Sequence, residues 1–360
     1  RMDLWQPLQV AHRTLRNRSV FPPVVTNLAS GGGEVTDDLL THYRRIAAGG
    51  AGLVIVEATY IHPSSRAFPF GLGADHPDKL PGLRRLAQAI KKEGALPGIQ
   101  LFHPGARANP NLAGVIGVDP SSITLMPDLP SRALTKGEIQ DLTKTFGDAV
   151  ELAVKAGFEL ICLHMAHGFL LSEFLSPLAN RRRDEYGGSL ENRLRFPLAV
   201  LEEALRRAPK AIISCRISAH EGEGGITPAE AAQIAQALSA HAHIIDVSAG
   251  WPGGAVVTVP PASVPPGCFL EYARIVKEAV SVPVIGVGRI TDHLLAQKAL
   301  AEGQADLIAF ARALLCDPEM PNKVRDGRPY EECDSCSGCH RLLHRGAKVR
   351  CIKKKAPESP

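Results

Sequence analysis

The sequence predicts a closed (β/α)8 barrel followed by a short cysteine-rich segment. Eight short apolar runs, rich in β-branched residues, alternate with stretches that have the 3.6-residue periodicity of amphipathic helices. Continuous apolar runs of this kind are typical of parallel strands that are buried on both faces. The 360 residues, of which 45% are hydrophobic, are enough to build the core of one such domain. An open doubly wound sheet is the alternative. It is less favoured than the barrel, because no GxGxxG motif follows an early run.

The predicted strands cover, in chain order, residues 19–25, 53–57, 97–102, 159–164, 211–216, 243–248, 283–288 and 306–311. Helical stretches such as DDLLTHYRRIAAGG and AAQIAQALSAHA separate them. A barrel of eight βα units carries its functional groups at the C-terminal ends of the strands. The stretch 104–131, rich in Pro and Gly, is longer than a routine connection and predicts an active-site lid or insertion. We therefore expect a barrel over residues 1–328 and a separate segment over 329–360.

Composition and charge argue against several classes of function. The formal net charge of +4 is too small to indicate nucleic-acid binding, and the basic residues are not interleaved with aromatic ones. No stretch approaches the roughly 20 consecutive apolar residues that span a bilayer. The first residues, RMDLWQPLQV, have no apolar run behind their basic start, unlike a secretory signal. We expect a cytoplasmic homo-oligomer that acts on a small-molecule substrate, without nucleic-acid or membrane partners.

The segment CDSCSGCHRLLHRGAKVRC holds four cysteines in the pattern C-x2-C-x2-C-x11-C, namely Cys333, Cys336, Cys339 and Cys351. Three cysteines separated by two residues each are typical of a loop that wraps a cubane 4Fe–4S cluster, which a distant fourth thiolate closes. Structural Zn²⁺ is the alternative. A disulfide pair is the least favoured, because no secretory signal precedes these thiols. The remaining cysteines are isolated: Cys162, Cys215, Cys268 and Cys316. Cys162 and Cys215 lie in apolar runs and are expected to pack as small hydrophobic residues.

Basic residues surround the four cysteines. They are Arg341, Arg345, Lys348, Arg350, Lys353, Lys354 and Lys355. One interpretation is a solvated terminus. The other is a docking face for an acidic electron donor or acceptor protein.

The fourth predicted strand ends in two histidines, His164 and His167. At the catalytic face of a barrel, such a pair could bind an anionic oxygen, donate to a carbonyl or ligate a metal, and a packed or solvated pair is the alternative. The string HMAHGFL that contains them is followed by FLSP and by NRRRDEYGGSLENRLRF, which ends at Phe196. Together these strings resemble the signature of the old yellow enzyme family of FMN-dependent oxidoreductases.

The resemblance extends over nearly the whole chain. It includes GIQLFHPGAR at 98–107, VSAGW at 247–251, and RALLCDPE at 312–319. A four-cysteine segment directly after the barrel resembles the subgroup of 2,4-dienoyl-CoA reductase and trimethylamine dehydrogenase. Those proteins continue into nucleotide-binding domains, whereas this sequence ends nine residues after Cys351. We expect either a shortened chain or a member that receives electrons from elsewhere.

The resemblance implies FMN at the barrel mouth, with NAD(P)H as an external reductant. Gln100 would hydrogen-bond the pyrimidine edge of the flavin, and Arg216 would lie near N1, where a fixed cation stabilises the charge of the reduced ring. For Arg216 an ion pair at the barrel rim is the alternative. The implied cofactor-binding residues are Pro23, Val24, Val25, Thr26, Ala58, Gln100, Arg216, Gly288, Arg289, Ala311 and Arg312. We expect the barrel alone to supply this site.

His164 and His167 match the pair that holds the substrate oxygen over flavin N5 in the family. The resemblance also implies a pocket wall, in which each residue could equally be packing: Tyr60, Arg107, Phe169 and Trp251. Many members carry a tyrosine at the position of Phe169 that protonates the substrate carbon, and a phenyl ring has no proton to give. The dienoyl-CoA reductases have a histidine where this chain has Pro252. Both expected acids are missing.

The leading hypothesis is an FMN- and iron–sulfur-dependent oxidoreductase that reduces an activated alkene of the enone or enoyl type. The second is the oxidation of a small amine, with Tyr60 and Trp251 as an aromatic wall beside a cation. The third is a noncatalytic electron-transfer module in which the barrel only holds FMN near the cluster. The fourth is a zinc-stapled barrel enzyme without flavin.

Overall fold

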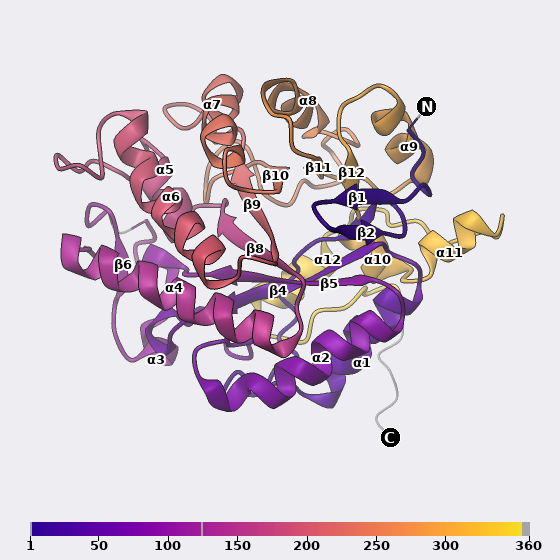
Figure 1. Cartoon of the computed structure of the whole chain (residues 1–360), viewed down its shortest axis with the longest axis horizontal. Helices are drawn as coiled ribbons and strands as arrows, with labels where there is room; N and C mark the ends of the chain where they lie inside the picture. The colour runs from indigo at the N-terminus through magenta and orange to yellow at the C-terminus, as the bar shows by residue number, and fades with distance from the viewer. Residues whose placement is uncertain (1, 124, 355–360) are drawn as a thin grey trace.

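In the computed structural model, residues 2–123 and 125–354 are described, and eight parallel strands among them close into a barrel surrounded by helices (Figure 1). The strands are β3 (Ser19–Phe21), β4 (Leu53–Tyr60), β5 (Leu96–Phe102), β8 (Leu160–Met165), β9 (Ile212–Ser218), β10 (Ile244–Ser248), β11 (Val284–Gly286) and β12 (Leu307–Ala309). They follow one another around the barrel in chain order, and β12 pairs with β3 to close it. Each predicted strand takes part, so the predicted (β/α)8 fold is confirmed.

The helices between the strands pack on the outside of the barrel. They are α1 (Asp37–Ala48), α2 (Leu80–Lys92), α4 (Lys136–Ala156), α6 (Leu190–Arg207), α7 (Pro228–Ser239), α8 (Leu270–Ala279), α9 (His293–Ala301) and α10 (Arg312–Cys316). Shorter elements are α3 (Pro110–Ala113), α5 (Leu170–Leu175), α11 (Met320–Arg325), α12 (Gly338–His344), η1 (Pro63–Ser65), η2 (Pro77–Lys79) and η3 (Gly105–Arg107). Within the described ranges, none of these helices combines the length and apolar character needed to cross a membrane.

The termini of the helices follow from local sequence. The longest, α4, begins at a capping box in which Thr135 accepts from the amide of Glu138 while the Glu138 carboxylate accepts from the amide of Thr135. It ends at Gly157, whose φ of 108° is readily adopted only by glycine. The glycine at the end of α4 fixes the turn that leads into β8, the strand that carries His164.

The core has two layers. Side chains inside the barrel, among them Leu53, Leu160 and Cys162, form one cluster. Side chains between strands and helices, including Cys215, form the other. Both cysteines pack among aliphatic neighbours, as expected.

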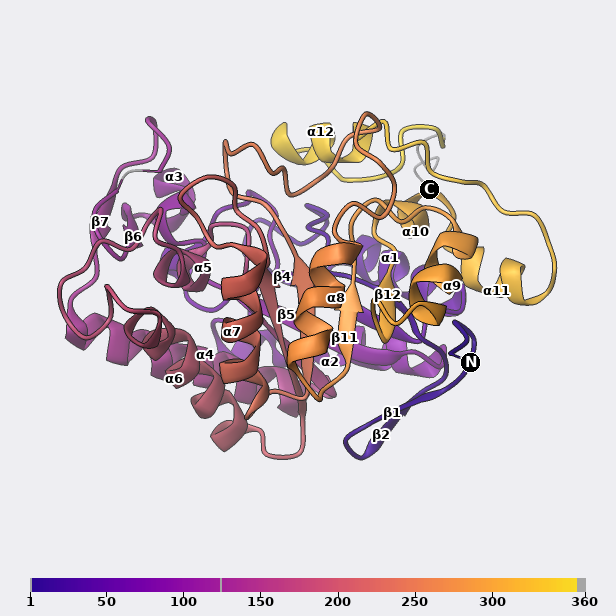
Figure 2. The ribbon, with the colours of Figure 1, turned by 90° about the horizontal axis from the view of Figure 1, so that it is seen from above.

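An N-terminal hairpin that the sequence did not reveal closes one end of the barrel. Its strands β1 (Leu8–Val10) and β2 (Arg13–Leu15) pair antiparallel, and Val10 and Leu15 join the inner cluster. Three-residue strands are too short to show a periodic pattern. Figure 2 places this hairpin at the end of the barrel opposite α12.

The predicted insertion 104–131 contains η3, α3 and the short strand β6 (Gly117–Asp119), which pairs with β7 (Ser131–Ala133). Buried Asp119 organises the turn after β6, because its carboxylate accepts from the amides of Ser121 at 2.6 Å and Ile123 at 3.0 Å. After β12 the chain passes through α10 and α11, and α12 then lies across the upper end of the barrel (Figure 2).

Candidate active site

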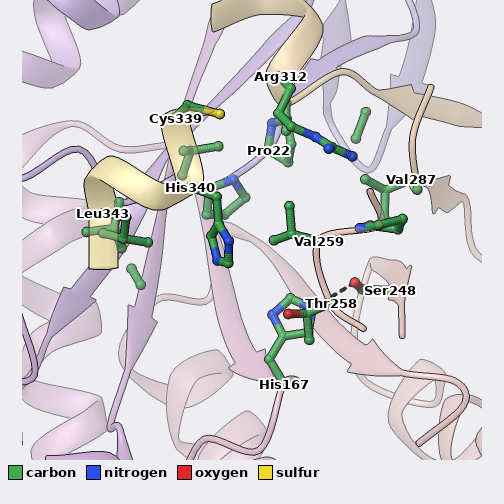
Figure 3. Close-up of a pocket in the computed structure, with 18 of the residues that line it drawn as sticks. Pro22, His167, Ser248, Thr258, Val259, Val287, Arg312, Cys339, His340 and Leu343 are labelled. Carbon is green, nitrogen blue, oxygen red and sulfur yellow. Dashed lines mark hydrogen bonds between the residues drawn. The ribbon is translucent and has the colours of Figure 1, made fainter. Parts of the chain in front are cut away.

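A cavity of about 300 Å³ opens at the C-terminal ends of the strands, beneath α12 (Figure 3). Side chains from most of the barrel strands converge on it. The residues predicted from the sequence that line it are Pro23, Val24, Val25, Ala58, Gln100, Arg107, His164, His167, Phe169, Arg216, Gly288, Arg289, Ala311 and Arg312. Of the insertion 104–131, only Arg107 is among the described lining residues.

Three of the residues predicted to bind flavin or substrate lie outside the lining of this cavity. The hydroxyl of Thr26 donates to buried Glu57 at 2.7 Å. The hydroxyl of Tyr60 donates to the carbonyl of Gly32 at 3.1 Å and accepts from Lys79 at 3.0 Å. Trp251 is only 7% exposed and packs in the loop after β10. The aromatic wall expected for a cationic substrate is therefore not assembled around the cavity.

His164 is buried at the end of β8 in a form that can donate a hydrogen bond. Its Nδ1 accepts from the backbone amide of Ala166 at 3.3 Å. Burial lowers the pKa of His164 well below its ordinary value, and the charge of Arg216 lowers it further. A neutral imidazole whose Nδ1 accepts must carry its proton on Nε2. His164 can therefore offer one N–H donor to an oxygen in the cavity.

His167 is held differently. Its backbone has a φ of 62°, a left-handed conformation that is uncommon for residues other than glycine. The amide of His167 donates to Ser218 at 2.9 Å, and Arg107 donates to its carbonyl. Its Nε2 lies 2.7 Å from the hydroxyl of Ser248, the contact drawn as a dashed line in Figure 3. The turn after β8 is thus fixed by its neighbours, so that both imidazoles face the same cavity.

Arg216 unites the two roles considered for it. Its guanidinium lines the cavity, and its Nε lies 3.6 Å from a carboxylate oxygen of Asp246. Both side chains are buried, and the carboxylate oxygens of Asp246 have no hydrogen-bond partner within the described chain. Burial raises the pKa of Asp246, and Arg216 opposes that rise. Arg216 therefore forms an ion pair with Asp246 through its Nε side and also places a fixed positive charge at the cavity wall.

The residues that line the cavity fit a flavin mononucleotide. The strip Pro23–Val25 and Ala58 offer apolar lining residues for the ring, and the amide of Gln100 offers the paired donor and acceptor that a pyrimidine edge needs. Arg289 and Arg312 offer cations for a phosphate. Gly288 has a φ of 117°, and a Cβ there would lie 2.7 Å from the ring of Phe269, so this turn requires glycine.

The cysteine-rich segment forms part of the cavity wall. Cys339, His340, Leu343 and His344 of α12 line it together with Val349, and the ring of His340 extends from α12 into the space that His167 faces (Figure 3). The Nε2 atoms of His340 and His344 lie 3.1 Å apart. The expectation that the barrel alone supplies the site is wrong. The two histidines four residues apart after Cys339 were the signal that could have revealed this wall.

The four predicted cluster cysteines line one small hollow between α10 and α12. Cys316 lines it as well, although it is isolated in the sequence, because α10 ends beside Cys351. Burial, and then the neighbouring Cys351 thiol, raise the pKa of Cys316 to about 12. Across the described residues, no group of three or more Cys, His, Asp or Glu side chains is placed to hold a single metal ion. A cubane binds each thiolate to a different iron atom, so its ligands converge on a larger space than those of one Zn²⁺ ion.

Part of the predicted basic tail is neutralised within the chain. Lys348 pairs with Asp38 at 2.8 Å and Lys353 with Asp334 at 3.0 Å. A second hollow, of about 340 Å³, lies beside Cys351, and its charged or titratable walls are His42, Arg45, Arg350 and Lys354. Arg45 comes from α1 and could not be assigned to this surface from the sequence. Lys355 lies outside the described residues.

Comparison with known proteins identifies the family. A sequence profile of the NADH:flavin oxidoreductase / NADH oxidase family matches residues 3–331. The chain belongs to this family. The family description supports a flavin-dependent oxidoreductase that works with NAD(P)H, in agreement with the implied FMN.

The relatives of this chain include longer proteins. NADH oxidase from Thermoanaerobacter brockii is 38% identical over 351 residues, which is 94% of this chain and 53% of that protein. The chain spans about half the length of the curated relatives it matches first. Among solved structures, 2-naphthoyl-CoA reductase in complex with 2-naphthoyl-CoA has a TM-score of 0.94 at 27% identity, over 98% of this chain and 57% of that one. Histamine dehydrogenase from Rhizobium sp. 4-9 has a TM-score of 0.88 at 31% identity, over 97% and 51%.

Proposed function

We propose that this protein is an FMN- and iron–sulfur-dependent reductase of an activated alkene, of the enone or enoyl type. One observation carries the proposal. Two buried neutral imidazoles, His164 and His167, face a cavity whose charged lining residues, among those the structure describes, are arginines without any carboxylate. Hydrogen-bond donors and positive charge favour a substrate that presents an electron-rich carbonyl oxygen.

The two histidines would hold and polarise that carbonyl. His164 offers its Nε2 proton to the oxygen, and His167 can turn its Nε2 from the Ser248 hydroxyl toward the same atom. Both donors withdraw electron density from the conjugated double bond, which makes its far carbon more electrophilic. Bound FMN would supply the hydride at N5. The strip Pro23–Val25, Ala58 and Gln100 would orient the flavin ring.

The proton that completes the reduction has no evident donor among the expected positions, because Phe169 and Pro252 carry none. Water or another side chain of the cavity would supply it. Because no acid is positioned for this step, we expect proton transfer to be slower than in a relative that has a positioned phenol.

Amine oxidation is the second candidate, and the similarity to histamine dehydrogenase favours it. A protonated amine, however, would lie near the charges of Arg107 and Arg216, which both act on the histidine pair, and no carboxylate is among the described lining residues to pair with it. Tyr60 and Trp251 also lie away from that lining. Charge and geometry therefore favour the carbonyl substrate over the cation.

The four cysteines would hold a 4Fe–4S cluster, as in the subgroup that the C-terminal segment resembles. Their spacing and their shared hollow support this proposal, and a structural zinc ion is the alternative. The cluster would pass single electrons to the flavin from a partner protein or from a further domain. The expected homo-oligomer stays a prediction that sedimentation can test.

Two measurements test the proposed function. An absorption spectrum with iron, acid-labile sulfide, zinc and FMN analysis should give four irons and one FMN per chain. Anaerobic stopped-flow experiments should then show that 2-cyclohexenone or crotonyl-CoA reoxidises the reduced flavin, while histamine leaves the oxidised flavin unreduced. Flavin reduction by histamine without any reoxidation by an alkene would overturn the reductase in favour of the amine oxidase. A protein that holds zinc and no iron would overturn the cluster.

A further inference from the structure

We propose that Arg312 serves the flavin site and the cysteine cluster at the same time, so that FMN retention and cluster retention depend on each other through this side chain. The inference rests on the proposed FMN and iron–sulfur cofactors. To the implied role of Arg312 in FMN binding it adds a contact with the cysteine loop and a coupling between the two sites, which neither the sequence pattern nor the family membership assigns.

The two sites share a wall. Arg312 and Cys339 line the flavin cavity, and both also line the small hollow of the four cysteines. Figure 3 shows the Arg312 side chain and the Cys339 sulfur at the same end of the cavity. A group bound in the flavin cavity and a group bound in the cysteine hollow would therefore both lie next to Arg312.

Arg312 is also joined to the cysteine loop. Its Nη1 lies 3.3 Å from the hydroxyl of Ser337, which stands between Cys336 and Cys339. Ser335 and Ser337 have φ angles of 58° and 56°, so the loop that presents these cysteines turns sharply twice. A contact from α10 to the centre of this loop helps to fix the positions of the flanking thiols.

The charge of Arg312 is free to act on anions. Within the described chain, no carboxylate lies close enough to the Arg312 guanidinium to form an ion pair. Four thiolates and a phosphate are all anions, so one unpaired cation between them stabilises both groups.

The same segment is fastened to the strip that would support the flavin ring. The amide of Val349 donates to the carbonyl of Thr26 at 2.8 Å, and the side chain of Asn27 donates to the carbonyl of Ala347 at 3.1 Å. Residues after α12 thus hold the backbone just beyond Pro23–Val25. Loss of order in the cysteine segment would loosen this strip, which gives a second route for the coupling.

Arg289 is the matched control. It is an arginine that lines the flavin cavity but not the cysteine hollow, and it donates to the carbonyl of Val264 instead of the cysteine loop. The test compares Arg312→Ala and Arg289→Ala as anaerobically purified holoproteins. Three quantities are measured: the Kd of FMN, the iron content per chain, and the rate of iron loss to a ferrous chelator at saturating FMN.

Both substitutions should raise the Kd of FMN by about 10- to 100-fold, the effect of one lost charge-assisted hydrogen bond. Only Arg312→Ala should also lose iron several-fold faster at saturating FMN. In the wild type, added FMN should slow the loss of iron, because FMN bound to Arg312 would hold in place the side chain that contacts Ser337 of the cysteine loop.

Equal rates of iron loss in the two variants would overturn the inference and leave the proposed function standing. Wild-type protein that contains no iron or no FMN would instead contradict the proposed function itself. If circular dichroism shows that Arg312→Ala does not fold, two other measurements test the coupling. They are the rate of iron loss from Ser337→Ala and the effect of added FMN on iron loss from the wild type. Iron loss unchanged by both Ser337→Ala and FMN would then reject the coupling.

Discussion

The guanidinium of Arg107 lies over the ring of Phe169, with its carbon 3.7 Å from the ring centroid. Burial lowers the pKa of Arg107 to about 10, so the side chain remains a cation at neutral pH. Phe169 also packs edge to face against His164, with 4.8 Å between the ring centroids. The residue that stands where a phenol is expected is therefore fixed between a cation and the proposed substrate anchor.

The substitution Phe169→Tyr would add a hydroxyl to a ring that packs against Arg107 and His164, and this environment is suited to acid catalysis. The charge of Arg107 would stabilise a phenolate, which makes the phenol a stronger acid. We expect Phe169→Tyr to accelerate the reoxidation of reduced flavin by 2-cyclohexenone, by up to about 10²–10⁴-fold if the hydroxyl is well placed and less otherwise. Stopped-flow absorbance at the flavin band measures the rate.

Phe169→Leu is the control for this substitution, because it removes the ring without adding an acid. It should not accelerate the reaction. No gain with any alkene, together with reduction of the wild-type flavin by histamine, would contradict the alkene reductase.

Removal of Arg216 should weaken FMN binding, but it also leaves Asp246 buried without its ion pair. We therefore expect Arg216→Ala to lower stability by about 3–5 kcal/mol. The double variant Arg216→Ala, Asp246→Asn should recover much of this stability, because no unpaired buried charge remains.

The double variant separates folding from flavin binding. It should still bind FMN about 10- to 100-fold more weakly than the wild type, since the cation expected near N1 is gone. Urea denaturation gives the stability, and quenching of FMN fluorescence gives the Kd. A double variant with wild-type FMN affinity and flavin potential would show that Arg216 does not contact the flavin.

Electron entry from an acidic donor protein should depend on the hollow beside Cys351. Arg45 and Lys354 line it, and within the described chain neither side chain pairs with a carboxylate. We expect Arg45→Ala and Lys354→Ala to slow cluster reduction by an acidic ferredoxin at low salt. The wild-type rate should fall as salt rises, because the Debye length shortens from about 10 Å at 0.1 M to about 3 Å at 1 M.

Lys348→Ala serves as the comparison, because Lys348 already pairs with Asp38. Its effect should be small. Reduction rates that respond neither to salt nor to Arg45 and Lys354 would leave the tail as a solvated terminus.

Glu221 should make stability fall as pH rises. Burial raises the pKa of Glu221 from 4.5 to about 7, so the folded protein keeps a proton there that the unfolded chain has already released. Between about pH 4.5 and pH 7 this group therefore lowers the free energy of unfolding with increasing pH, by at most ~1.4 kcal/mol per unit.

Glu221→Gln should remove this contribution. The hydrogen bonds from Ser176 and from the amide of Ile226 go to Oε2, and Oε1 has no partner within the described chain, so an amide nitrogen can take its place. The variant should gain stability relative to the wild type as pH rises from 5 to 8, measured by urea unfolding of both proteins. A stability difference that does not change with pH would contradict the raised pKa.

The sequence by itself determined the barrel and the local parts of the site. β-branched runs select strands, alternating helical stretches cover them, and eight such units predict a closed barrel. His164 and His167, like Cys333 to Cys339, are close in the chain, so their spacing already places them together. Those patterns act through neighbouring residues, and they are visible without a structure.

Only the tertiary structure decided which distant residues meet. It brought Arg312 to Ser337, Cys316 to Cys351 and Arg45 to the basic hollow, and it laid α12 across the barrel mouth. It also turned Thr26 toward Glu57 and Tyr60 toward Gly32, away from the cavity. None of these contacts has a periodic signature, because each depends on how whole elements pack and on which buried polar groups find partners. Local periodicity therefore determined the barrel, whereas packing between distant elements determined the wall that the flavin cavity shares with the cysteines.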